Sequence, residues 1–92
     1  MQYKVGDIVK IIPSFLGEPE EVLAYVYEEY NIGSGEGVSV ITENGVNLGG
    51  FSEDEQKLYL DFVKKSGISY PFTNVINLDR DFNTLIKPLF NI

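Results

Sequence analysis

The spacing of apolar and polar residues along the chain predicts mostly β-strands. Four segments carry this pattern: 3–12, 22–31, 37–43 and 46–51. β-Branched residues dominate the first segment, and apolar and polar residues alternate in the third, as in a strand with one buried face. Asn44-Gly45 separates the third segment from the fourth, and this dipeptide favours a tight hairpin turn because both residues adopt positive φ readily. The last three segments are therefore predicted to form consecutive antiparallel strands.

The segment 20–31, EEVLAYVYEEYN, fits two structures. Pro19 followed by two glutamates is typical of the start of a helix. Against a helix, the segment is rich in Val and Tyr, and Glu28 and Glu29 would lie unfavourably at a helix C-terminus. We interpret the segment as a strand, with a helix as the alternative.

Residues 52–66 carry the pattern of an α-helix. Ser52 and Glu55 have the spacing of a capping box, in which each side chain bonds the backbone N–H of the other residue. The apolar stripe that follows consists of Leu58, Tyr59, Phe62 and Val63. Two lysines fall in the expected last turn, and Gly67 is suited to end the helix.

The C-terminal part of the chain predicts one more strand and a short helix. Residues 70–78, YPFTNVINL, fit a strand with a proline near its beginning. A short helical turn is expected to open at 79–81 and to carry Phe82, Leu85 and Ile86, and the apolar residues after it, Leu89, Phe90 and Ile92, should pack back onto the body. Pro88 should stop this helix.

The first strand, YKVGDIVKI at residues 3–11, resembles the opening strand of SH3-like barrels, in which a V-G-D-x-V pattern precedes the first long loop. The resemblance implies a shape and no particular activity, because such barrels serve many functions. We therefore predict one mainly β (α+β) domain over residues 1–92. It would be a small antiparallel SH3-like barrel or curved sheet, with one inserted α-helix at about 52–66 and a short C-terminal helical turn.

The distribution of charge adds an expectation about partners. The net charge is −7, and residues 11–56 contain ten acidic residues and no basic one. Direct nucleic-acid binding is disfavoured, because its affinity comes largely from Lys and Arg that neutralise phosphates. A basic protein partner would be attracted to such a surface, although acidic residues also keep small proteins in solution.

The residue types disfavour catalysis. The chain has no His and no Cys, so the commonest general base, the thiol nucleophile and the usual zinc ligands are missing. The glycine-rich segment 33–37, GSGEG, lacks the spacing of a dinucleotide loop and the Lys of a Walker loop, and its Glu36 would repel phosphate. We interpret this segment as a hairpin loop. The sequence thus predicts a protein that is not an enzyme and that uses no cofactor and no metal.

Localisation follows from the same composition. The apolar runs are a few residues long, whereas a membrane helix needs about 20. The first residues turn polar at once, unlike a signal peptide, and cysteine is absent. We expect a cytoplasmic protein that does not enter a membrane.

The second predicted strand supplies a candidate contact surface. Tyrosine combines apolar area with a hydroxyl group and is a common interface anchor, although it is also common in strand cores. The residues that we assign to this surface are Tyr25, Tyr27, Glu28, Glu29, Tyr30 and Glu36, together with the loop 33–37.

Two functions of different kinds follow from these residues. The first is a small acidic binding module that recognises a protein partner, in particular a basic one. The alternative is a mimic of nucleic acid, in which carboxylates take the place of phosphates on a nuclease or repressor. The mimic requires the glutamates to lie in a row on one face, so the two functions differ in geometry.

Overall fold

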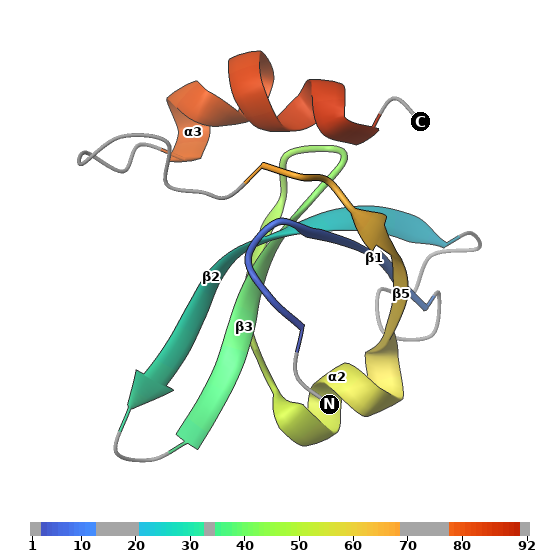
Figure 1. The fold of residues 1–92 in the computed structure, drawn as a ribbon, viewed down its shortest axis with the longest axis vertical. Coiled ribbons are helices and arrows are strands. Elements are labelled where there is room, and N and C mark those ends of the chain that lie inside the picture. The colour runs from blue at the N-terminus through green and yellow to red at the C-terminus, as the bar shows by residue number, and fades with distance from the viewer. Residues whose placement is uncertain (1–2, 13–20, 33–34, 69–77, 91–92) are drawn as a thin grey trace.

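The fold was analysed in a computed structural model, which describes residues 3–12, 21–32, 35–68 and 78–90. Five strands form one antiparallel sheet: β1 (Asp7–Ile11), β2 (Val22–Ile32), β3 (Gly35–Thr42), β4 (Asn47–Ser52) and β5 (Leu60–Lys65). Their order in the sheet is β4-β3-β2-β1-β5 (Figure 1). Within the described residues the sheet is open, with β4 and β5 at its edges, so the mainly β fold is confirmed as a curved sheet and a closed barrel is not formed.

The strand at 22–31 and the three-strand meander β2-β3-β4 are confirmed. Both faces of β2 are covered: Ala24 and Val26 lie in one apolar cluster, and Tyr25 lies in another. A strand that is buried on both faces carries apolar residues at consecutive positions, which explains why this segment lacks a clean alternation. A turn joins β3 to β4 as predicted, but the expected positive φ at Asn44 is wrong: among the described residues only glycines have positive φ, and here Gly45 has +85°. The Gly45 N–H donates to the Thr42 carbonyl at 2.9 Å, so Glu43 and Asn44 are the central residues of the turn.

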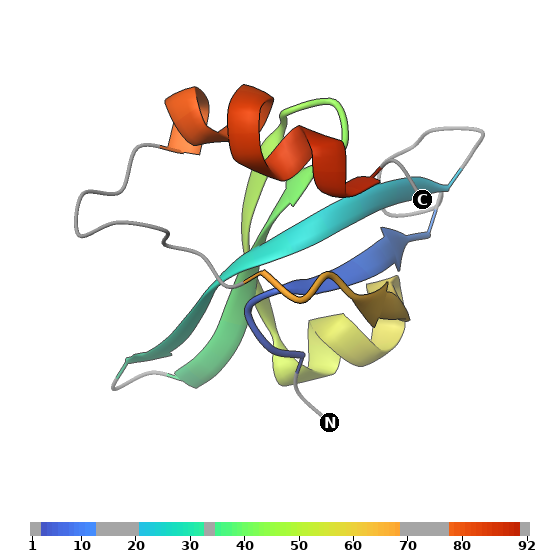
Figure 2. The same cartoon turned by 45° about the horizontal axis from the view of Figure 1, so that its top comes forward.

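The two clusters lie on opposite faces of the sheet. We call the first the α2 face; its buried residues are Val9, Ile11, Ala24, Val26, Val38, Val40, Phe51 and Leu60. We call the second the C-terminal face; it contains Ile8, Tyr25 and Ile41 from the sheet, with Phe82 and Ile86 from the C-terminal helices. Figure 2 shows these helices across one side of β2 and helix α2 on the other side of the sheet.

Helix α2 (Glu53–Tyr59) begins as predicted and ends earlier than predicted. The capping box of Ser52 and Glu55 is present, but the chain turns extended at Leu60 and continues as β5. The predicted helix at 52–66 is therefore wrong beyond Tyr59. Its apolar stripe does not form one inward face, because Leu58 is 64% exposed and Phe62 is 50% exposed.

Helix α2 ends early because the residues after it pair with β1 as a strand. Strand β1 pairs with β2 along one side, and β5 pairs with its other side from Asp7↔Lys65 to Ile11↔Leu60. In the extended form, Leu60 enters the core of the α2 face and Val63 packs on the C-terminal face. The lysines that suited a helix C-terminus, Lys64 and Lys65, are exposed on a strand.

The C-terminal segment is helical, as predicted, but its bounds differ. It consists of α3 (Leu78–Asp81), the π-helix η1 (Phe82–Ile86) and the 3₁₀-helix η2 (Lys87–Phe90). Pro88 does not end the helix; it occupies the second position of η2, where its missing N–H removes no bond of a continuing helix. Phe82 and Ile86 are buried and Leu85 is exposed, and Leu89 and Phe90 pack against the cluster of the C-terminal face, as predicted. Ile92 lies outside the described residues. The predicted strand at 70–78 falls outside the described residues, except for Leu78, which begins α3.

A tight turn precedes β1. Asp7 donates its N–H to the Lys4 carbonyl at 3.0 Å, and Gly6 has a φ of +99° at the third position of this turn. The Asp7 carboxylate is nearly buried: Oδ2 accepts from the Lys4 N–H at 2.9 Å, and Oδ1 lies 3.3 Å from Lys65 Nζ. The geometry of the turn requires glycine at position 6, because a Cβ there would lie 2.9 Å from the Ile68 carbonyl oxygen.

The first prediction concerns this turn. Replacing Asp7 with Ala should lower the free energy of unfolding by about 2 kcal/mol, because the Lys4 N–H loses its buried acceptor. Asp7→Asn keeps an oxygen for that N–H and should recover more than half of the loss. Urea denaturation of both variants measures the difference. Equal damage from Ala and Asn would show that the pair with Lys65, and not the turn, is the important contact.

The second prediction concerns Gln56, which is fully buried between α2 and the sheet. Its Oε1 accepts from the Tyr3 N–H at 2.9 Å, and its Nε2 donates to the Phe51 carbonyl at 3.1 Å. Gln56→Ala should lower the free energy of unfolding by roughly 2–4 kcal/mol, because it removes both hydrogen bonds of a fully buried side chain. The control is Lys57→Ala, which removes only an exposed ion pair with Glu53 and should change stability by less than about 0.5 kcal/mol. Similar thermal stability of the two variants would contradict this role of Gln56.

Candidate protein-contact surface

A bulge in β2 sets the direction of the candidate contact residues. Val26 pairs with Val40, but the next pair is Glu28 with Ser39, so Tyr27 is one extra residue on β2. Tyr27 packs beside Ile41 on the C-terminal face, and Glu28 accepts from the Ser39 hydroxyl at 3.0 Å. The bulge thus places two consecutive side chains, Tyr27 and Glu28, on the same face.

Tyr25 does not belong to the contact surface. Its side chain is fully buried in the cluster of the C-terminal face, and its hydroxyl donates to the Ile68 carbonyl at 2.6 Å. The prediction that Tyr25 contacts a partner is therefore wrong. The physical reason is that Tyr25 packs with Phe82 and Ile86 of the C-terminal helices, which cover this part of β2.

Tyr27 is half-buried and held by polar contacts. Its hydroxyl donates to Asn47 Oδ1 at 2.8 Å, and the same oxygen accepts from the Gly49 N–H at 3.0 Å. Asn47 therefore connects the Tyr27 ring to the edge strand β4. A ring fixed at both ends loses little rotational freedom when it contacts a partner.

Tyr30 lies over two glycines of the neighbouring strands. A Cβ at Gly50 would lie 2.8 Å from Cε1 and from the hydroxyl oxygen of Tyr30, and a Cβ at Gly37 would collide with the same hydroxyl. Glycine at these positions lets the ring lie flat across β3 toward β4. The interpretation of 33–37 as a loop needs correction: residues 33–34 lie outside the described residues, and Gly35–Gly37 belongs to β3 because Gly37 pairs with both Tyr30 and Ser52.

The three glutamates of the predicted surface do not lie on the same face of the sheet. Glu28 is exposed beside the two tyrosines on the C-terminal face. Glu29 pairs with Val38 and points to the other side, where it accepts from the Val5 N–H at 3.1 Å and lies 3.6 Å from Lys4 Nζ. Glu36 is exposed, and it precedes Gly37 in the strand, so its side chain leaves the face on which Tyr30 lies.

The structure therefore joins Tyr27, Glu28 and Tyr30 on one face, and we call these three residues the tyrosine surface. Sequence reasoning missed three of its supports: Ser39, Asn47 and Gly50. Gly37 was assigned to the surface as part of the loop 33–37, but its role beneath the Tyr30 ring was not predicted. Glycines within strands are a signal for the close approach of another group, and Gly37 and Gly50 carry that signal. Nothing in the sequence pointed to Asn47 as the partner of Tyr27.

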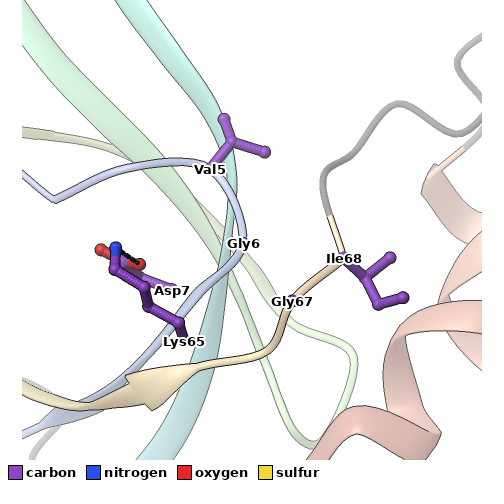
Figure 3. A pocket seen from close by; sticks show the side chains of 6 residues that line it. All are labelled: Val5, Gly6, Asp7, Lys65, Gly67 and Ile68. Carbon is purple, nitrogen blue, oxygen red and sulfur yellow. Dashed lines mark hydrogen bonds and ion pairs between the residues drawn. The ribbon is translucent and has the colours of Figure 1, made fainter.

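Two hollows lie elsewhere in the described residues. The first, of about 250 Å³, is lined by Val5, Gly6, Asp7, Lys65, Gly67 and Ile68. In Figure 3 the Asp7 and Lys65 side chains meet, while Val5 and Ile68 point away from them. Because both Asp7 oxygens already bond within the protein, this carboxylate is structural. The second, of about 450 Å³, is lined by Glu43, Asn44, Asn83, Lys87, Pro88 and Phe90. Neither hollow brings two carboxylates together.

Two further kinds of site were sought. Over the described ranges, acidic side chains do not gather in groups of three or more that could hold a metal ion. The longest α-helix in the same ranges is α2, with seven residues, and none could cross a membrane. Comparisons with protein families, with curated proteins and with solved structures gave no match.

The environment of two tyrosines generates a prediction about pH. Burial raises the pKa of Tyr27 above its ordinary value of 10.0. The hydrogen bond with Asn47 opposes this shift of the pKa, and the negative charge of Glu28 adds to it. Burial and the charges of Asp61 and Asp7 likewise raise the pKa of Tyr3. Above pH 10 the folded protein therefore holds more protons than the unfolded chain, so stability must fall as the pH rises.

The free energy of unfolding should be level near neutral pH and should decline above about pH 10. Tyr27→Phe should make the decline less steep, because Phe does not ionise. Urea denaturation at several pH values between about 8 and 11 measures the slope. An identical slope in Tyr27→Phe and in the unchanged protein would contradict the raised pKa of Tyr27.

Proposed function

We propose that this chain is a small protein-binding module and that the tyrosine surface contacts a basic partner. The observation that carries the proposal is the joining of Tyr27, Glu28 and Tyr30 on one face, next to the part of β2 that the C-terminal helices cover. Two aromatic rings with a carboxylate between them offer apolar area and negative charge at the same place.

The two rings are suited to be anchors because they are already held in place. Tyr30 rests on Gly37 and Gly50, and Tyr27 is bonded to Asn47. Binding therefore orders few further side-chain rotations, and this keeps the entropic cost of association low. Tyrosine is one of the residue types that contribute most to binding energy at interfaces.

The expectation of a basic partner rests on charge. The protein carries −7, and Glu28 is an exposed carboxylate beside two ring faces that themselves attract cations. A Lys or Arg side chain of a partner could contact a ring and the carboxylate together. The long-range field of the protein would also speed the encounter at low salt.

The geometry favours this function over nucleic-acid mimicry. A mimic needs its carboxylates in a row on one face, but Glu28 and Glu29 point to opposite faces of the sheet. Glu29 is also paired with Lys4, which partly neutralises its charge. We propose no catalytic role, since neither described hollow holds a pair of carboxylates.

The proposal is tested by affinity capture from a cell lysate with the purified protein, followed by a salt gradient and mass spectrometry. Basic proteins should be retained by the unchanged protein and lost with Glu28→Lys. Glu21→Lys is the matched control: it makes the same change of charge at an exposed residue just before β2, and it should retain the partners.

The double variant with Ser at Tyr27 and Tyr30 separates the rings from the charge. It should lose the same partners while circular dichroism shows a folded protein. Equal capture by the unchanged protein, Glu28→Lys and the double variant would refute the tyrosine surface.

A further inference from the structure

We propose that the partner of the tyrosine surface supplies an extended segment that pairs with the outer edge of β4. This inference rests on the proposed function and names the form of the partner. The occupant is a short extended stretch of a protein that carries Lys or Arg. Addition of a strand to an open sheet edge is a common way of binding peptides, because main-chain bonds supply affinity and side chains supply specificity.

The two edges of the sheet differ in their protection. Strand β5, LDFVKK, displays the exposed charges of Asp61, Lys64 and Lys65, which discourage pairing with another strand. Strand β4, NLGGFS, contains no charged residue and no proline. Charged side chains and proline are the usual means by which a protein blocks an edge, so within the described ranges β4 is the less protected edge for a partner strand.

The hydrogen-bond pattern of β3 shows how β4 presents its backbone. Thr42 donates its N–H to Val46, on the side of β4, and Glu43 donates to Leu23 of β2. Backbone groups alternate in direction along a strand, so Ser39 bonds toward β2. Gly50 is opposite Ser39, and its N–H and C=O therefore point away from β3, toward the outer edge.

The available edge is short and centred on Gly50. A bulge shifts the β3–β4 register between Val40 and Ile41. At the two sides of Gly50, the Gly49 N–H is bonded to Asn47 and the Ser52 N–H is bonded to Glu55. Gly50 is exposed and has no side chain, so a second backbone can approach it closely.

The side chains around Gly50 indicate what the segment carries. The Tyr30 ring reaches across Gly37 to Gly50, so it would lie beside the added strand. At the Ser52 end, β4 runs directly into the exposed acidic first turn of α2: Glu53, Asp54 and Glu55. Lys57 is the basic residue of this helix, and it is paired with Glu53. A segment with a basic residue near that end would be complementary in charge.

The test uses a synthetic peptide of alternating Val and Lys, with blocked ends, titrated into the ¹⁵N-labelled protein and followed by NMR. The Gly50 amide should shift and its hydrogen exchange should slow, while the Phe62 amide of β5 serves as the internal control. A peptide of the same sequence with N-methylated central amides cannot donate main-chain bonds, and it should bind at least roughly tenfold more weakly. Replacing each Lys of the peptide with Glu should weaken binding to a similar extent.

Three results would overturn strand addition. The first is equal binding of the plain and N-methylated peptides, and the second is a response at Phe62 instead of Gly50. The third is the absence of any shift with the plain peptide at millimolar concentration. If the lysate experiment still shows partners that depend on Glu28 and on the two tyrosines, the tyrosine surface stands and only the strand geometry fails.

Discussion

The burial of β2 on both faces is the constraint on which the rest of the structure depends. Ala24 and Val26 are buried on one face of the sheet and Tyr25 on the other, so a single sheet without covering helices would leave these side chains exposed to solvent. Helix α2 with β5 supplies the first cover, and the C-terminal helices supply the second through Phe82 and Ile86. Tyr27, at the bulge, still packs against the cluster of the C-terminal face but is only half-buried, and Glu28 after it is exposed, so β2 changes there from a core strand into a surface strand.

The elements that the sequence predicted correctly are those fixed by neighbouring residues. The hairpin turn after β3 and the capping box of Ser52 depend on a few consecutive residues, and both are present, although only Gly45 of the turn has positive φ. The end of α2 depends on β1, which is about fifty residues away in the sequence and needs a partner for its second side. The residues near Leu60 do not indicate that β1 requires a second partner strand, and for this reason the helix was predicted to continue to residue 66.

The sequence predicted most residues of the candidate contact surface, but it did not predict the face of the sheet to which each side chain points. Strict alternation along β2 would place Glu29, and not Glu28, on the face of Tyr25 and Tyr27. The bulge exchanges the two: it brings Glu28 and Tyr30 to the face of Tyr27 and sends Glu29 toward Lys4. An extra residue in one strand is defined only against its partner strand, so the bulge became visible only when β2 and β3 were aligned in the structure.

The pairing of β1 with β5 has a consequence for the order of folding. The meander from β2 to β4 joins neighbours in the chain, whereas Asp7 and Lys65 meet across 58 residues. Closing so long a loop carries an entropic cost that the short hairpins do not, and contacts of this kind slow folding. During synthesis β1 must therefore wait, with one side unpaired, until β5 has left the ribosome. The exposed charged residues of β5 then lie along the edge of the sheet that forms last, where they discourage pairing with another strand. These residues are Asp61, Lys64 and Lys65.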